Sequence, residues 1–172
     1  MKIAFKMFIR NIHRYLFWAV ISVVVWAWIF SLATDTVRAK KVVVYCDAPF
    51  VSERELMIEL EKDLPEGIRL VKVSSFESLE FGMYTEDADI YVIPGSSLAD
   101  AADKLAPLPF EGAEGYTSGG KLLAAKLGGG AGSFISGEDL YICVSAASPH
   151  SGLEGAKDSA AVYIVGKILS LP

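Results

Sequence analysis

One uncharged stretch near the N-terminus constrains this chain more than any other feature. Residues 15–33 read YLFWAVISVVVWAWIFSLA and contain no Asp, Glu, Lys or Arg. As an α-helix these nineteen residues extend about 29 Å, close to the thickness of the hydrocarbon core of a bilayer. Aromatic rings that favour the membrane interface lie toward its ends, at Tyr15, Trp18, Trp26 and Trp28. We therefore predict a transmembrane helix at residues 15–33, through which the chain contacts the lipid bilayer.

A cleaved signal peptide is the competing interpretation of this stretch. Signal peptides have an apolar region of about 7–15 residues followed by a small-x-small cleavage site. Residues 31–33 (SLA) and 37–39 (VRA) each match such a site. The apolar run here is longer than that range, and the segment before it is also long, so we favour an uncleaved anchor. A helix buried in a protein core would need a larger protein to surround it.

The charges that flank the span favour a cytoplasmic N-terminus. Four basic residues precede it (Lys2, Lys6, Arg10 and Arg14), and three follow it with one acidic residue among them (Asp35, Arg38, Lys40 and Lys41). The small excess on the N-terminal side predicts that residues 1–14 are cytoplasmic. The first four basic residues recur every four positions. This spacing fits either an interfacial segment that binds anionic lipid or the ordinary basic sequence that flanks a transmembrane helix on its cytoplasmic side.

The part of the chain after the span is strongly acidic. Residues 1–41 carry a net charge of +6 and residues 42–172 a net charge of −11, which together give −5. A domain this acidic is not expected to bind nucleic acid or an anionic membrane surface. We predict a single-pass protein of the cell membrane, in which a polar linker at residues 34–41 joins the span to an extracytoplasmic domain at residues 42–172.

The pattern of this domain predicts alternating strands and helices. Apolar, β-branched runs predict strands at residues 41–46, 68–73 and 88–93. Between and after them we expect helices at residues 52–64 and 98–104 and a short helix or turn at residues 74–83. Ser52 and Glu55 have the spacing of a capping box at the start of the first helix. This order is typical of an α/β fold, a small, mostly parallel three-layer α/β/α domain.

The remainder of the domain is less regular. Residues 106–137 are rich in glycine and proline, and within them we interpret residues 121–127 (KLLAAKL) as a strand. A strand is predicted at residues 139–144 and a closing helix at residues 159–171. Its core-facing positions are Ala161, Val162, Val165, Ile168 and Leu169.

Small polar residues follow each of the first three predicted strands. In parallel sheets, ligands lie outside the carboxyl ends of the strands. The residues there are Asp47, Ser74, Ser75, Ser96 and Ser97. We predict that they contact a ligand, although Ser and Asp also supply caps and turns routinely.

Several segments together resemble the first lobe of type 2 periplasmic solute-binding proteins. They are VVVYCDAPF (42–50), EKDLPEGIRLVKV (61–73) and ADIYVIPGSSLADAADKLAPLP (88–109). The late segment DLYICVSAASPHSGLEGAKDSAAVYIVGKIL (139–169) is similar to the return to that lobe, where a strand, a loop and a final helix pack back. The resemblance implies a small-solute receptor of the bacterial cell envelope that serves transport.

The chain departs from that family in length. Between the two halves of the first lobe lie only about 30 residues, 110–139, which is too short for a second lobe. At most a hairpin fits, so the chain looks like a one-lobed derivative. We therefore expect a solute-binding-like protein associated with a membrane transporter or another membrane protein. The alternative is a non-enzymatic module for protein–protein interaction.

Other motifs give no support for catalysis, a cofactor or a metal site. Residues 115–121 (GYTSGGK) match part of a phosphate-binding P-loop, but Leu122 stands where Mg²⁺ binding needs Ser or Thr, so we expect a flexible loop. Glu86, Asp87 and Asp89 are too few oxygen ligands for Ca²⁺ and are interpreted as a solvated turn. His150 is interpreted as a loop residue near the ligand-facing edge. The glycines of residues 128–132 are interpreted as a flexible turn.

The two cysteines, Cys46 and Cys143, each end an apolar run. Burial as small hydrophobic side chains is the simpler interpretation. Outside the cytoplasm the two cysteines could instead form a disulfide if their strands are neighbours.

Overall fold

The computed structural model describes residues 12–34, 37–75, 88–110, 112–128 and 133–171. The chain divides into two compact units, residues 1–36 and residues 37–172. In the first, α2 (Ile12–Thr34) is a single helix of 23 residues. Residues Ile12–Phe30 are long and apolar enough to cross a membrane. Large apolar side chains are exposed on this helix, as the predicted anchor requires, among them Phe17, Trp18, Val23 and Trp26.

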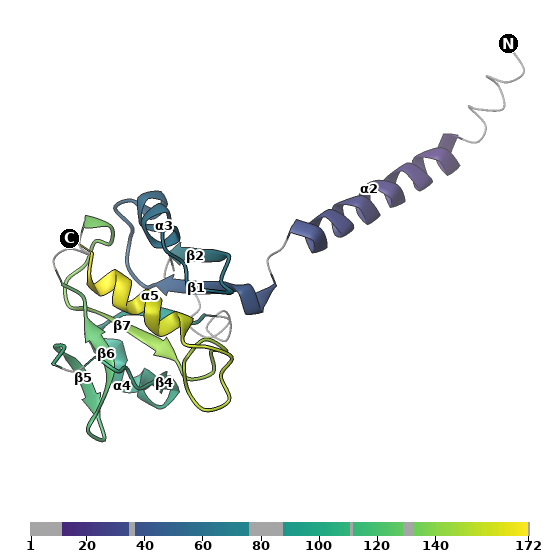
Figure 1. Cartoon of the computed structure of the whole chain (residues 1–172). Coiled ribbons are helices and arrows are strands. Elements are labelled where there is room, and N and C mark those ends of the chain that lie inside the picture. Colours follow the sequence, from purple (N-terminus) through teal and green to yellow (C-terminus); the bar gives the residue numbers. More distant parts are fainter. Residues whose placement is uncertain (1–11, 35–36, 76–87, 111, 129–132, 172) are drawn as a thin grey trace, which may run out of the picture. The chain divides into compact units, whose positions relative to one another are not determined.

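The second unit is built on one seven-stranded sheet with the order β2-β1-β3-β7-β6-β5 (Figure 1). The strands are β1 (Lys41–Cys46), β2 (Leu70–Ser75), β3 (Ile90–Pro94), β4 (Leu105–Ala106), β5 (Gly115–Ser118), β6 (Lys121–Lys126) and β7 (Leu140–Ser145). The helices are η1 (Arg38–Lys40), α3 (Glu53–Glu61), η3 (Gly95–Ser97), α4 (Leu98–Ala101), η4 (Ala102–Lys104) and α5 (Ala160–Leu169). The short β4 pairs with β7 beside the main order.

The sheet is mixed, which corrects the prediction of a mostly parallel sheet. Strands β2, β1 and β3 are parallel, as expected. Strand β7 runs antiparallel to β3, and β6 and β5 continue in antiparallel order. The short connection between β5 and β6 accounts for the antiparallel arrangement of that pair, since strands joined by a two-residue turn must be antiparallel. Gly119 and Gly120 form that turn with φ of 58° and 76°, the positive values that a type I′ hairpin needs.

This hairpin also corrects the interpretation of residues 115–121 as a flexible loop. They form β5, the turn and the first residue of β6, with Ser118 opposite Lys121. The prediction of a strand at residues 121–127 is confirmed by β6. The expectation that a hairpin occupies the interval 110–139 is also confirmed, and the hairpin joins the same sheet as β1–β3.

Helices cover both faces of the sheet. On one face, α3 and α5 enclose a core that includes Val44, Ile90 and Ile142. On the other, α4 packs Leu98 and Ala101 against a smaller cluster that includes Ile93 and Cys143 (Figure 1). Along β3 and β7, successive residues alternate between these two clusters, because successive side chains of a strand point to opposite faces. The result is an α/β domain in which α4 is the thinner of two helical layers.

Several local predictions differ from the structure in extent. Helix α3 ends at Glu61 rather than near residue 64, and its N-cap Ser52 makes no side-chain hydrogen bond, so the capping box is not formed. Helix α5 buries Ile164 in addition to the predicted positions, while Val162 and Leu169 are only partly buried. Most of the predicted segment 74–83 and of the glycine run 128–132 lies outside the described residues.

The two cysteines are free and buried on opposite faces of the sheet. Cys46 belongs to the larger core and Cys143 to the smaller cluster, and β3 separates their strands. A disulfide between them is therefore excluded by the fold, and burial is the interpretation that holds. Burial raises the pKa of each thiol to about 12.

We expect both thiols to resist a thiol-exchange reagent at pH 8 in the folded protein and to react in denaturant. An unfolded thiol has a pKa of about 8.5. The protonated thiols therefore stabilise the fold fully below that pH, and this contribution is lost as the pH rises toward 12. Alkaline unfolding followed by circular dichroism should be less steep in the Cys46→Ala, Cys143→Ala variant. Rapid labelling of either thiol in the folded chain would contradict the described burial.

Candidate functional site

The five predicted ligand residues lie at one edge of the sheet. Asp47 directly follows β1, and its backbone N–H donates to the carbonyl of Val92 on β3 at 2.7 Å. Ser74 and Ser75 end β2, opposite residues 45 and 46 of β1. Ser96 and Ser97 lie in η3, directly after β3. Because β2, β1 and β3 are adjacent and parallel, and neighbouring strands lie about 4.8 Å apart, these residues share what we call the carboxyl edge.

The antiparallel strand β7 brings further polar groups to the carboxyl edge. Asp139 immediately precedes β7, and its carbonyl accepts a hydrogen bond from the Gly95 N–H at 3.0 Å. A Cβ atom at position 95 would lie 2.5 Å from Asp139 Oδ2 and 3.0 Å from the Tyr141 ring. Only glycine leaves room for this approach, which places the Asp139 carboxylate beside the chain that leads into Ser96.

Asp139 is the centre of a polar cluster formed with Glu114, Lys126 and Tyr141. Lys126 Nζ lies 3.4 Å from Asp139 Oδ1 and 3.7 Å from Glu114 Oε1. The Tyr141 hydroxyl donates to Asp139 Oδ1 at 3.2 Å. Asp139 itself has φ of 54°, the one positive value among the described non-glycine residues. The cluster offers both signs of charge to a ligand, and the Asp139 side chain is 61% exposed.

The pKa values of two groups reflect these contacts. The hydrogen bond to Asp139, followed by the charges of Tyr141 and Glu114, raises the pKa of Lys126. Desolvation, followed by the hydrogen bond to Asp139, raises the pKa of Tyr141. Both groups therefore keep their protons at neutral pH, with Lys126 positive and Tyr141 able to donate.

The sequence prediction missed the polar cluster. The structural feature that forms the polar cluster is the pairing of Lys126 with Tyr141 across β6 and β7. That pairing exists only with antiparallel strands, whereas the predicted sheet was mostly parallel.

Part of the carboxyl edge is covered by the chain itself. Phe50 and Ile135 form an isolated antiparallel bridge. Val51 N–H donates to the Phe134 carbonyl at 2.8 Å, and Ser136 N–H to the Pro49 carbonyl at 2.9 Å. The segment that leads into β7 therefore pairs antiparallel with the chain just beyond Asp47. The more exposed part of the edge lies at Ser96 and the polar cluster.

The opposite edge of the sheet, the amino edge, carries a buried polar network. Strand β7 runs antiparallel to β3, so the loop that follows it begins where β3 begins. The Ser145 N–H accordingly donates to the Asp89 carbonyl at 2.9 Å. His150, in this loop, lies at the amino edge, which corrects its expected position near the ligand-facing edge.

Asp89 is the centre of this network and is 0% exposed. Its carboxylate accepts two hydrogen bonds from the Arg38 guanidinium, at 2.5 and 2.8 Å. It also accepts from the Val43 N–H at 2.8 Å and from the Ser148 hydroxyl at 2.5 Å. The interpretation of Asp89 as part of a solvated turn was wrong, because a buried carboxylate with a cationic partner is a structural ion pair. Glu86 and Asp87 lie outside the described residues.

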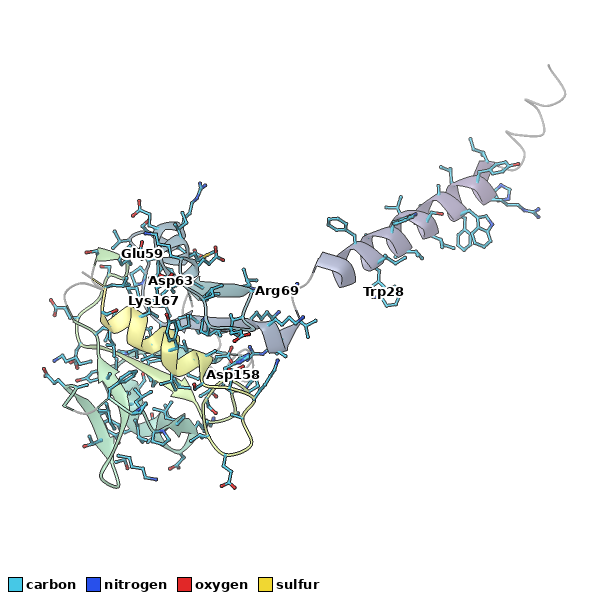
Figure 2. The ribbon with its side chains drawn as sticks, in the orientation of Figure 1. Trp28, Glu59, Asp63, Arg69, Asp158 and Lys167 are labelled. Carbon is cyan, nitrogen blue, oxygen red and sulfur yellow. The ribbon has the colours of Figure 1, made fainter. Side chains whose placement is uncertain are left out.

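His150 is fully buried between two acceptors. Its Nδ1 lies 2.7 Å from Asp158 Oδ1, and its Nε2 lies 3.4 Å from the Arg38 carbonyl oxygen. Asp158 lies just before α5 (Figure 2). A His–Asp pair orients the imidazole in serine hydrolases, where the other nitrogen contacts the nucleophile. Here that nitrogen faces a backbone carbonyl, so the contacts of this pair are those of a structural histidine.

Among residues 12–34, 37–75, 88–110, 112–128 and 133–171, no three His, Cys, Asp or Glu side chains are grouped so that they could hold a metal ion. Compared with protein-family models, with curated proteins and with solved structures, the chain matches none.

Proposed function

We propose that this chain is a membrane-anchored, solute-binding-like protein, with its N-terminus cytoplasmic and its α/β domain outside the cytoplasm. In this role the carboxyl edge holds a small polar solute for an associated membrane transporter. The observation that carries the proposal is the meeting of three strand ends with the polar cluster around Asp139. Hydroxyl groups and charges of both signs at one edge suit a charged, hydrogen-bonding solute.

The arrangement of the later elements also supports this proposal. The resemblance to solute-binding proteins implies that the late strand returns to the first lobe and that the final helix packs back on it. Strand β7 lies beside β3, and α5 shares a core with α3 and β1. The interval that would hold a second lobe contains the β5–β6 hairpin. A one-lobed receptor leaves its solute more exposed, so we expect weak binding.

A thermal-shift screen of the full-length chain in detergent tests this function. The panel contains amino acids, peptides, sugars, polyamines and phosphate. A ligand that binds only the folded state and is present at about 100 times its Kd should add about 2.7 kcal/mol of stability, a shift of several degrees. We expect the shift to be lost in Asp139→Asn and in Ser96→Ala.

Glu154→Gln is the matched control, since it removes one exposed negative charge from the loop at the opposite edge. If the thermal shift survives in Asp139→Asn and Ser96→Ala, the ligand binds somewhere other than the carboxyl edge. A flat screen on a cooperatively folded domain would refute solute capture.

The second candidate function is a non-enzymatic protein-interaction module. It is favoured by the segment around Phe134 and Ile135, which pairs with the chain beyond Asp47 and leaves less of the edge for a solute. A photo-crosslinking residue in place of Ser96 should then link the chain to one membrane protein. The control places the same crosslinking residue at position 154. If the yield of crosslink at position 96 does not exceed that control, the result counts against this function.

A further inference from the structure

The first residues of the second unit are fixed by contacts from distant parts of the domain. The Arg38 side chain is paired with Asp89, and its carbonyl faces His150 Nε2. Lys157 Nζ donates to the Ala39 carbonyl at 3.0 Å. The Arg69 N–H donates to the Lys40 carbonyl at 2.8 Å. Residues 38–40 are thus an integral part of the fold, although they begin only four positions after Thr34, where α2 ends.

Asp89 depends on Arg38 for its charge balance. Within the described part of the chain, Arg38 is the cation that forms an ion pair with this carboxylate. The Arg38 side chain is 32% exposed, whereas the Asp89 side chain is 0% exposed. If the pair is broken, arginine can turn to water, but the carboxylate stays buried with only the Val43 N–H and the Ser148 hydroxyl as neutral donors. Removing one partner of a buried ion pair is strongly destabilising for this reason.

This dependence bears on the second small-x-small site, residues 37–39 (VRA). Hydrolysis of the Ala39–Lys40 bond would add water across it, leaving a carboxylate on Ala39 and an ammonium group on Lys40. The released domain would lack Arg38. The new ammonium group supplies a positive charge, but it does not supply the planar pair of N–H donors that the carboxylate oxygens accept.

We propose that Arg38 makes the integrity of the domain depend on an uncut second small-x-small site, residues 37–39. A chain cut after Ala39 loses the counter-charge of a buried carboxylate and with it much of its folding stability. The domain is therefore stable only in forms of the chain that keep Arg38, which include the anchored form. The proposal is independent of whether the carboxyl edge binds a solute or a protein.

Arg38 variants of the full-length chain in detergent test this coupling by native-state proteolysis. In Arg38→Ala we expect the population of the protease-sensitive, open domain to rise at least about 100-fold. Adding Asp89→Asn should recover most of this loss, since a neutral amide is less costly to bury than an unpaired carboxylate. Arg69→Ala is the matched control, because Arg69 is exposed just before β2 (Figure 2) and its loss should change the open population little.

Three outcomes would overturn the proposal. In the first, the Arg38→Ala chain resists protease as well as Arg69→Ala does. In the second, adding Asp89→Asn to Arg38→Ala does not restore protease resistance. The third concerns the wild-type chain carrying a C-terminal tag. We expect it in membranes at full length, and a folded, protease-resistant fragment beginning at Lys40 would show that the domain does not need Arg38.

Discussion

Two aspartates in the middle of α2, Val23→Asp with Val24→Asp, are expected to release the chain from membranes. Both valines lie near the centre of the apolar segment and are exposed on the helix. A charged residue at the centre of a membrane helix costs about 2.5–3.5 kcal/mol on insertion scales, so two cost roughly 5–7 kcal/mol. The wild-type chain should stay in the membrane pellet after alkaline carbonate extraction, and the variant should move to the supernatant.

The matched control is Val37→Asp with Val51→Asp. These valines are 65% and 63% exposed in the second unit, so the same two charges are added outside the span. We expect this variant to remain in the pellet. If the wild-type chain itself is extracted by carbonate, α2 does not anchor the protein in the bilayer.

Ile142→Ala is expected to lower the free energy of unfolding by about 2–5 kcal/mol. Ile142 is 0% exposed on β7, opposite Val92 of β3 and Ala125 of β6. Truncation removes apolar contacts and leaves a cavity that a central strand closes poorly. Urea unfolding of the full-length chain in mild detergent, followed by circular dichroism, measures the change.

Ile58→Ala makes the same chemical change at a position on α3 that is 51% exposed. There the lost burial is smaller, and alanine is the better helix former, so the free energy of unfolding should change by less than about 1 kcal/mol. Equal losses from the two substitutions would contradict the placement of Ile142 in the core.

The positions of β1, β2, β3, β6 and β7 were predictable, whereas β4 and β5 and the antiparallel direction of β7 were not. Runs such as residues 41–46 and 139–144 are apolar and β-branched, and this local pattern is enough to locate a buried strand. Direction depends on the connection between strands. For β7 that connection contains a hairpin whose first strand, β5, is short and polar and carries no periodic signal.

The candidate site divides in the same way. Asp47 and Ser96 were predicted because a residue directly after a parallel strand always lies at the carboxyl edge. Lys126 and Asp139 come together only through the register of β6 with β7. The Arg38–Asp89 pair joins residues 51 positions apart, so local sequence made Asp89 look like part of a surface turn.

The placement of the β5–β6 hairpin has a kinetic consequence. A two-lobed receptor traps its solute by hinge closure, and release waits for the lobes to reopen. Here β6 is hydrogen-bonded to β7, and β7 to β3, so the β5–β6 hairpin belongs to the same sheet as the carboxyl edge. A solute held at this edge would leave without any opening step, and its residence time would depend on its contacts alone. Fast exchange suits delivery to a transporter more than long-term storage.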